Sequence, residues 1–446
     1  MSVSVGFISL GCSKNLVDSQ IMAGYLKSGR IALAPSPETA DMILINTCAF
    51  IEAAREETAE AILSACEHKK NGACRAVIVT GCMVQRYRER MLEAFPDVDA
   101  FLGVDELDQV AAAVRRLAAG KEVGLKVKKG LPVRLFTPKY PTLLFTGGPF
   151  AYVKIAEGCD HRCAYCAIPD IRGNFRSRGL DEIVREAAHM VSAGVRELNL
   201  ISQDTLHYGM DMEQALSITD LSRAVDGIEG EFRFRLLYGH PAGITGEMLE
   251  VMNSARHLCR YLDLPVQHSH PDILRAMNRG KAVAATDGLA ERLRQAVPGV
   301  VLRTTCMVGF PGESDEHFNH LLEYVAESKF DHLGVFAFSP EEGTPAFEMD
   351  GVPDEDVTAD RCERLMALQM AIVDDKARGL VGQMDKALLL CPGACGDWTA
   401  RLPRQAPEVD GETIVSGVPA GARKGDLIMV EITGGKGYDL TARAVC

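Results

Sequence analysis

The chain has 446 residues, of which 47% are hydrophobic and 24% are charged. These values are ordinary for a globular protein and disfavour a disordered, collagenous or coiled-coil chain. The formal net charge of −13 arises from 48 Lys and Arg against 61 Asp and Glu. Such a balance disfavours a protein whose main task is to grip nucleic acid through a basic face.

The chain shows no sign of a membrane or secretory segment. No apolar run approaches the roughly 18 residues that indicate a membrane span. The first residues, MSVSVGFISLG, have no basic leader before their apolar stretch and are typical of a strand. We therefore expect a cytoplasmic protein without a membrane partner, and at about 150 residues per domain its length indicates two to four domains.

Residues 1–118 alternate short apolar runs with amphipathic stretches, which predicts an open parallel sheet with helices between its strands. The predicted strands are residues 4–10, 41–47 and 75–81, and the predicted helices are residues 19–27 and 52–67. Residues 119–148 carry Gly, Pro and Lys without clear periodicity and are predicted to be a linker.

Two further domains are predicted after the linker. Residues 149–378 contain six strand–helix units, which fit a partial parallel (β/α)6 barrel better than a second open sheet. Its predicted strands are residues 152–156, 195–202, 232–238, 261–266, 300–308 and 333–338. Residues 379–446 hold short strands separated by Gly and Pro, which predict a small antiparallel barrel, so the fold class is α/β with a β-barrel at the C-terminal end.

The strongest motif is a cysteine array. In a reducing cytosol the 14 cysteines are expected to be free thiols, so those that cluster are candidate metal or redox ligands. Cys159, Cys163 and Cys166 have the spacing CxxxCxxC and follow the strand YVKIA, where active sites of parallel barrels form. Three thiolates suit a [4Fe–4S] cluster with one open iron. The alternative is zinc, which usually takes four protein ligands from CxxC knuckles.

Three other cysteines occupy equivalent places in the N-terminal region. Cys12, Cys48 and Cys82 each come directly after a predicted parallel strand. Because the carboxyl ends of neighbouring parallel strands meet at one edge of a sheet, we expect these three thiols to share a metal site. The alternative is that each is a small buried residue at a strand end.

The CxxxCxxC array resembles that of the radical S-adenosylmethionine (SAM) superfamily, in which an aromatic residue precedes the last cysteine. Tyr165 occupies that position, and the resemblance implies that it helps to bind SAM. In the superfamily the open iron chelates the amino and carboxylate groups of SAM. Reductive cleavage then yields a 5′-deoxyadenosyl radical that abstracts a hydrogen from an unactivated carbon.

The strings around the other cysteines, LGCSKNLVDSQ, NTCAFIEAA and TGCM, resemble the N-terminal domain of the methylthiotransferases. With the radical array and a terminal barrel similar to a TRAM domain, the resemblance covers essentially the whole chain. One class of this family modifies an adenosine in tRNA, and the other, RimO-type class modifies an aspartate of the small-subunit ribosomal protein S-twelve. The chain resembles the RimO type in LGCSKNLVDSQ, where Gln20 stands in place of the usual Glu. It also resembles that type in NTCAFIEAAREE, EGCDHRCAYCAIPDIRGNFRSR, FRLLYGHP, LPVQHSHPDIL and APEVDG.

Further candidates to contact SAM are Gln203, Thr305 and Glu313. Gln203 ends the second barrel strand beside Asp204, whose alternative role is to cap a helix. Thr305 lies just before the string VGFPGE and Glu313 is its last residue. The string resembles a family segment near the adenosyl group and is alternatively a turn that begins the next helix. Arg172, Arg176 and Arg178 follow the radical array and are expected either to pair with a carboxylate of SAM or of an acidic substrate, or to be solvated.

The resemblance implies a methylthiotransferase that adds a methylthio group to the β-carbon of an aspartate in the ribosomal protein. It also implies two [4Fe–4S] clusters that face one cavity, SAM, an external electron donor and docking of the substrate by the terminal barrel. Methylthiolation of a tRNA adenosine by the same chemistry is an alternative that the acidic net charge disfavours. A non-catalytic iron–sulfur electron carrier and a zinc-binding structural protein are alternatives from other classes.

Overall fold

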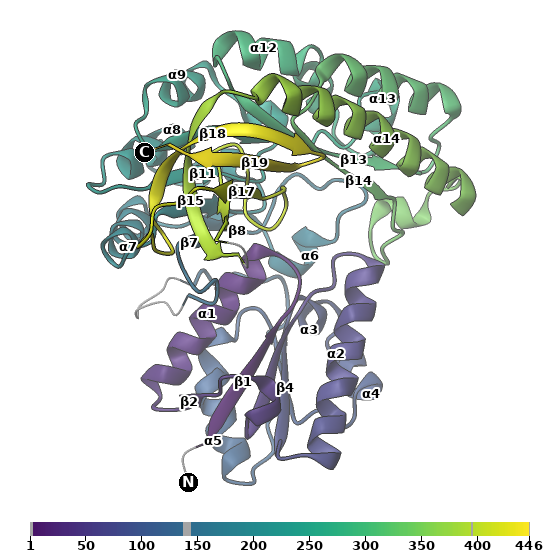
Figure 1. Cartoon of the computed structure of the whole chain (residues 1–446). Helices are drawn as coiled ribbons and strands as arrows, with labels where there is room; N and C mark the ends of the chain where they lie inside the picture. The colour runs from purple at the N-terminus through teal and green to yellow at the C-terminus, as the bar shows by residue number, and fades with distance from the viewer. Residues whose placement is uncertain (1–2, 137–143, 394–395, 446) are drawn as a thin grey trace.

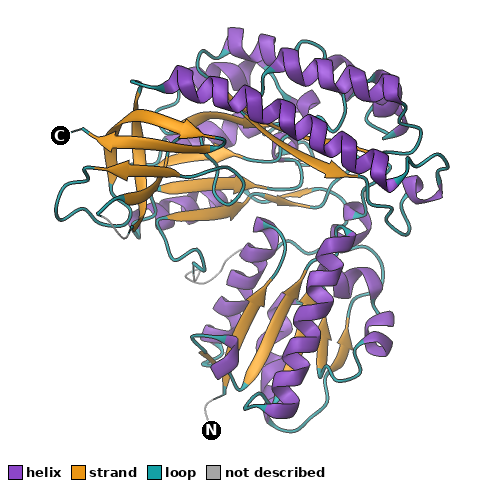
Figure 2. Ribbon diagram, turned by 45° about the vertical axis from the view of Figure 1, so that its right-hand side comes forward, coloured by secondary structure: helices purple, strands orange, loops and turns teal. Residues whose placement is uncertain are grey.

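The computed structural model describes residues 3–136, 144–393 and 396–445, which form three parts (Figure 1). An N-terminal sheet lies at one end of the molecule and a partial barrel lies at the other. A small terminal barrel packs beside the partial barrel (Figure 2).

The N-terminal sheet has six parallel strands in the order β2–β1–β3–β4–β5–β6. They are β1 (Ser4–Ser9), β2 (Ala32–Leu33), β3 (Met42–Thr47), β4 (Ala76–Gly81), β5 (Ala100–Leu102) and β6 (Gly124–Lys126). Its helices are α1 (Ser13–Ser28), α2 (Glu52–Asn71), α3 (Cys82–Tyr87), α4 (Arg90–Ala94) and α5 (Val110–Ala118). The three predicted strands are confirmed as β1, β3 and β4. The other three strands have two or three residues, too few to show a period, and β6 lies within the predicted linker.

The central strands of this sheet are apolar over most of their length because helices cover both of its faces. In β3, Met42 and Leu44 pack with residues of α1 and α5, whereas Ile43 and Ile45 pack with residues of α2 and α3. Successive side chains of a strand point to opposite faces, so a strand between two layers of helices has no polar face.

The partial barrel has six parallel strands in the order β7–β10–β11–β12–β13–β14, with β7 and β14 at its open edges. They are β7 (Phe150–Lys154), β10 (Glu197–Ile201), β11 (Arg233–Leu236), β12 (Leu258–Asp263), β13 (Val301–Val308) and β14 (His332–Ala337). The six predicted strands match them in order. Its main helices are α7 (Leu180–Ser192), α8 (Ile218–Asp226), α9 (Gly246–Ser254), α10 (Pro271–Ala276), α11 (Ala282–Thr286), α12 (Leu289–Ala296), α13 (Asp315–Ser328) and α14 (Glu355–Leu380).

Between β7 and α7 the chain forms the short antiparallel pair β8 (Ala156–Glu157) and β9 (Arg176–Ser177), with α6 (Ile168–Arg172) between them. In Figure 1, α6 lies where the partial barrel meets the N-terminal sheet. Among the described helices, none is both long and apolar enough to cross a membrane.

The terminal barrel is closed, in the order β15–β16–β17–β19–β18. Its strands are β15 (Met384–Pro392), β16 (Trp398–Arg401), β17 (Thr413–Ser416), β18 (Leu427–Lys436) and β19 (Asp439–Ala444). Neighbouring strands are antiparallel except for β17 and β19, which pair in parallel within the described residues.

The loop between β16 and β17 joins the terminal barrel to the partial barrel. This loop contains the APEVDG string, and its carboxylates meet buried side chains of the partial barrel strands. The Tyr152 hydroxyl donates to Glu408 at 2.6 Å, while Asp410 accepts from the Tyr261 hydroxyl and from Arg303, each at 2.7 Å. The string is therefore bound to side chains of β7, β12 and β13, and it holds the terminal barrel against the partial barrel.

Candidate active site

All six cysteines of the two predicted triads line one cavity of about 360 Å³ between the N-terminal sheet and the partial barrel. The N-terminal triad is Cys12, Cys48 and Cys82, and the barrel triad is Cys159, Cys163 and Cys166. Lys14, Phe50, His161, Tyr165, Arg172, Gln203, Asp204, Tyr238, His240, Gln267 and Arg279 also line the cavity.

The N-terminal triad converges because its three strands are neighbours in the sheet. Cys12 follows β1, Cys48 follows β3 and Cys82 begins α3 directly after β4. Glycines allow the chain to turn there with a positive φ, which is +82° at Gly11 and +97° at Gly81. A Cβ on Gly11 would lie 2.6 Å from Cys48 Cβ, and one on Gly81 would overlap Asn46 Oδ1. Glycine therefore precedes Cys12 and Cys82 because a larger residue would collide with the neighbouring chain.

The barrel triad lies on the loop between β8 and α6. The Cys159 amide donates to Gly173 O at 3.1 Å, and the Cys166 amide donates to Cys163 O at 3.0 Å. Arg279, which follows α10, places Nη1 at 3.6 Å from Cys163 Sγ and donates through Nη2 to Pro265 O at 2.7 Å. The loop is therefore fixed by backbone hydrogen bonds, with an arginine against one of its sulfurs.

Burial disfavours the thiolate form of four of the six cysteines in the cavity. Burial raises the pKa of Cys82 to about 12 and that of Cys159 to about 11, and it also raises the pKa of Cys48 and Cys166. A metal bound by these thiols must displace their protons, and its positive charge replaces the missing solvation of the thiolates.

The donor set fits an iron–sulfur cluster at each triad. Each triad offers three soft sulfur ligands. In each triad an arginine also donates to one sulfur: Arg172 donates to Cys82 Sγ at 3.2 Å, and Arg279 donates to Cys163 Sγ. The histidine within the barrel loop is already engaged, because His161 Nε2 lies 2.5 Å from Asp204 Oδ2 and its ring stacks on His240. This engagement disfavours His161 as a fourth ligand of zinc.

A buried network of four charges joins the two sides of the cavity. Asp18 of α1 accepts from Lys154 of β7 at 2.5 Å and from Arg172 of α6 at 2.6 Å. Glu157 accepts from Lys154 at 2.6 Å and lies 3.4 Å from Arg172, while Gln203 donates to its other oxygen at 2.9 Å. The two cations and two anions balance, as buried charges require.

The three arginines that follow the barrel triad all bind groups within the protein. Arg172 is paired within the protein, and Arg178 pairs with Glu186 at 2.7 Å and donates to Lys154 O. Both side chains are buried, so the expectation that they are solvated was wrong, and each already has a carboxylate partner within the protein. Half-buried Arg176 instead donates to backbone carbonyls, including that of Arg172 at 3.1 Å.

The four predicted SAM contacts fall in two places. Tyr165 and Gln203 line the cavity, whereas Thr305 and Glu313 are not among its lining residues. Thr305 O accepts from the Gln267 amide at 2.8 Å. Glu313 is buried, accepts from Arg361 at 2.8 Å and from the Gly309 amide at 3.0 Å, and its pKa is raised to about 7 by burial. Glu313 thus fixes the turn at the end of β13.

Asp204 caps a short helix, as one of the two alternatives predicted, because it accepts from the Leu206 amide at 3.2 Å. It also lines the cavity and contacts His161 there. Sequence reasoning missed Lys14, Tyr238 and Arg279. Lys14 lies two residues after Cys12, which was a usable signal. Nothing in the sequence around Arg279 indicates that its side chain, after α10, lies against the cavity.

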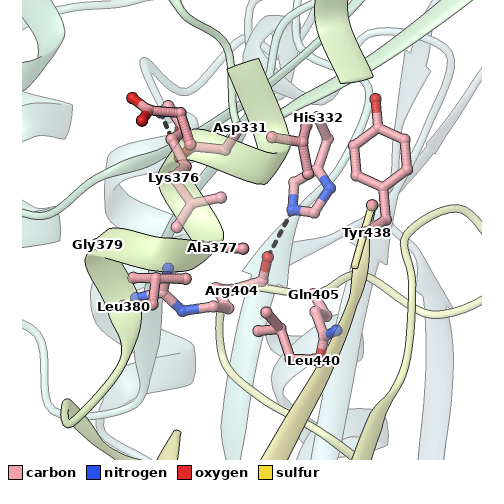
Figure 3. Close-up of a pocket in the computed structure, with 14 residues that line it drawn as sticks. Asp331, His332, Lys376, Ala377, Gly379, Leu380, Arg404, Gln405, Tyr438 and Leu440 are labelled. Carbon is pink, nitrogen blue, oxygen red and sulfur yellow. Dashed lines mark hydrogen bonds and ion pairs between the residues drawn. The ribbon is translucent and has the colours of Figure 1, made fainter. Parts of the chain in front are cut away.

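A second cavity, of about 400 Å³, lies where α14 meets the terminal barrel (Figure 3). Its polar groups pair with one another, since Lys376 binds Asp331 at 2.6 Å and His332 Nε2 lies 2.9 Å from Arg404 O. None of the described residues that line it is a cysteine. We regard it as part of the packing between the two barrels.

The chain matches three family models. The model described as "Uncharacterized protein family UPF0004" covers residues 4–103, the Radical SAM superfamily model covers residues 153–325, and the TRAM domain model covers residues 390–445. These matches correspond to the three parts of the fold.

Two solved structures share the fold. The radical SAM methyltransferase TsrM from Kitasatospora setae has a TM-score of 0.56 at 14% identity and covers 78% of this chain and 74% of its own. The cobalamin-dependent radical SAM enzyme OxsB has a TM-score of 0.52 at 13% identity, and the match covers 84% of this chain and 56% of the OxsB chain. At these identities the likeness concerns the fold alone.

Two relatives resemble the chain over its whole length, and both are named "Ribosomal protein uS12 methylthiotransferase RimO". The one from Pelotomaculum thermopropionicum is 42% identical over 448 residues and covers 100% of both chains. The one from Desulforamulus reducens is 41% identical over 439 residues and covers 98% of both. The chain belongs to the RimO family of methylthiotransferases, within the radical SAM superfamily.

Proposed function

We propose that this protein transfers a methylthio group to the β-carbon of an aspartate in ribosomal protein uS12. The observation that carries the proposal is that two triads of cysteines, far apart in sequence, line one cavity. In the proposal the barrel triad holds a [4Fe–4S] cluster that works with SAM, and the N-terminal triad holds a second, auxiliary [4Fe–4S] cluster.

The target carbon explains why such groups are needed. An aspartyl β-C–H bond has no acidic proton or leaving group, so general acid–base catalysis cannot activate it at useful rates. When bound, the cluster at the barrel triad together with SAM would supply a hydrogen-abstracting radical, and the auxiliary cluster would hold the sulfur that is transferred.

The chain's own residues position these groups. Cys159, Cys163 and Cys166 hold one cluster against the barrel loop, with Arg279 donating to Cys163. The N-terminal triad holds the other, with Arg172 donating to Cys82. Because Arg172 belongs to the barrel and also binds Asp18 of α1, one side chain fixes the separation of the two triads.

An electron carrier has no use for this arrangement, because it needs no substrate cavity between its clusters. A tRNA substrate would require phosphate contacts, which the net charge of −13 disfavours. The proposal also includes an external electron donor and a cytoplasmic location, where the ribosomal protein is accessible.

Three cysteine variants test the assignment of the triads. With reconstituted protein, SAM, a reductant and uS12, Cys163→Ala should abolish formation of 5′-deoxyadenosine. Cys48→Ala should still form 5′-deoxyadenosine but should not produce methylthiolated uS12. Cys66→Ala, which removes a buried thiol of α2 outside the cavity, is the matched control and should give product. If the Cys163 and Cys48 variants both make product, the assignment is wrong.

A further inference from the structure

Lys14 is a buried cation on the wall of the cavity. It lies in the first turn of α1, two residues after Cys12, and it is 9% exposed. Its Nζ lies 3.1 Å from the centre of the Tyr238 ring, a cation–π contact that fixes the position of the ammonium group. Tyr238 is in turn held by a contact of 3.2 Å between its hydroxyl and Ser13 Oγ.

This ammonium group has no anionic partner within the described residues. Cys12, Asp263 and Glu157 attract it from a distance, but none of the three forms an ion pair or hydrogen bond with Nζ. Asp263 instead accepts from the Tyr238 amide at 2.9 Å, and Glu157 belongs to the four-charge network.

Helix α1 adds to the positive electrostatic potential around Lys14. Helix α1 has 16 residues, no acidic residue in its first turn and no side-chain hydrogen bond at its N-cap, Cys12. The N-terminal end of a helix carries partial positive charge and favours an anion. The wall beside Cys12 therefore offers a buried site for one negative charge.

We propose that Lys14 binds the side-chain carboxylate of the substrate aspartate. This inference rests on the proposed function and adds to it the residue that recognises the substrate side chain. An ammonium group with one face against Tyr238 keeps N–H donors for a carboxylate, and the pair neutralises both buried charges.

The position of Lys14 suits the reaction. The reacting β-carbon is bonded directly to the carboxylate carbon, so a carboxylate held by Lys14 places the β-carbon close to it. Lys14 is two residues from Cys12 of the N-terminal triad, which in the proposed function holds the sulfur to be transferred. One ion pair would therefore select the substrate side chain and align its reacting carbon.

The methionyl carboxylate of SAM is the other carboxylate that enters this cavity under the proposed function. That carboxylate belongs to the barrel triad, where Arg279 supplies a cation beside Cys163. Lys14 lies in the N-terminal part, on the wall of the cavity beside Cys12. This position favours the carboxylate of the substrate over that of SAM as its partner.

The test measures discrimination between two substrates. One substrate is uS12, and the other is uS12 with the target aspartate replaced by asparagine, which has the same shape but no charge. Wild-type protein should favour the aspartate form in kcat/KM by roughly 100-fold, since a site built for a charged group rejects its neutral analogue. In Lys14→Gln the preference should fall to below about threefold, and Lys14→Arg should restore part of it. The ratio is taken within each variant, so a loss of cluster or of folded protein affects both substrates alike.

Binding without reductant gives a second measurement for a variant with too little turnover. The aspartate form should bind wild-type protein more tightly than the asparagine form, and Lys14→Gln should bind both equally. Lys27→Gln, an exposed lysine at the other end of α1, is the matched control and should keep the wild-type preference.

Three outcomes are distinguishable. An unchanged aspartate preference in Lys14→Gln overturns the inference and leaves the proposed function intact. Weaker binding of SAM to Lys14→Gln, with the preference unchanged, assigns Lys14 to SAM and also overturns it. No methylthiolation of uS12 by wild-type protein overturns the proposed function itself.

Discussion

Arg172 Nη2 lies 3.2 Å from Cys82 Sγ, so an arginine of the partial barrel donates a hydrogen bond to a cysteine of the N-terminal sheet. The same side chain binds Asp18 of α1 and lies close to Glu157, which comes two residues before Cys159. The two cysteine triads are therefore linked through one buried guanidinium group. The relative position of the two parts of the molecule depends on charges that are removed from water.

Loss of one anion from this network should destabilise the fold. Asp18→Asn leaves Lys154 and Arg172 with Glu157 as their remaining carboxylate, and breaking a buried ion pair from one side costs about 3–5 kcal/mol in the free energy of unfolding. Chemical denaturation measures this change. Asp360→Asn removes an exposed partner of Arg364 and should cost less than about 1 kcal/mol. Equal, small effects of both substitutions would mean that the network does not join the two parts.

A methyl group at Gly81 should disrupt the N-terminal triad. Gly81 has φ +97°, and its Cβ would overlap Asn46 Oδ1, so the chain before Cys82 must shift in Gly81→Ala. After anaerobic reconstitution, we expect the variant to hold about four irons instead of about eight, because each cluster of the proposed type holds four.

Gly120→Ala is the control for Gly81→Ala. Gly120 also has positive φ, at +67°, but has nothing within 4 Å of its added Cβ, so this variant carries the backbone strain without the collision. It should retain the iron content of wild-type protein. Full iron content in Gly81→Ala would contradict the steric account of the TGC string.

The APEVDG loop should stabilise the fold by binding the terminal barrel to the partial barrel. Asp410→Asn weakens the acceptor for Tyr261 and leaves Arg303, which is largely buried, without its close ionic partner, so we expect a loss of about 3 kcal/mol in the free energy of unfolding. Glu431→Gln, which breaks an exposed pair with Arg443 in the same barrel, should change it by less than about 1 kcal/mol. If the Asp410 variant is as stable as wild-type protein but binds uS12 poorly, the loop serves docking instead.

Glu313 should make stability depend on pH. Burial raises its pKa from 4.5 to about 7, although Arg361 acts in the opposite direction, so the folded protein favours the protonated carboxyl group. The stabilisation is complete below pH 4.5 and is lost as the pH rises through about 7. Glu313→Gln removes this titration, and between about pH 5 and about pH 8 it should lose less unfolding free energy than wild-type protein, by on the order of 2–3 kcal/mol. Parallel pH profiles for the two proteins would mean that Arg361 keeps Glu313 ionised throughout.

Sequence patterns predicted the main strands because those strands are long and buried. The apolar run of β3 is readable since helices cover both faces of its sheet, whereas β5, with three residues, leaves no period to detect. The three cysteines of the N-terminal triad were identified because each follows a readable strand, and the topology of parallel sheets brings strand ends together.

Other features depend on tertiary contacts that local sequence does not encode. Arg172 looked equally suited to bind a ligand or to face solvent, and its pairing with Asp18 joins residues 154 positions apart. Arg279 reaches Cys163 from 116 residues away. The predicted roles of Thr305 and Glu313 came from a family resemblance, and the structure places both outside the lining of the cavity.

The most direct test of the proposed function is an anaerobic assay of the reconstituted wild-type protein with SAM, a strong reductant and either uS12 or tRNA, read by mass spectrometry together with iron content. We expect about eight irons per chain and uS12 that carries the mass of one added methylthio group on an aspartate. Methylthiolated tRNA with unmodified uS12 would contradict the substrate assignment. About four irons, with cleavage of SAM but no methylthio transfer, would contradict the assignment of Cys12, Cys48 and Cys82 to a second cluster.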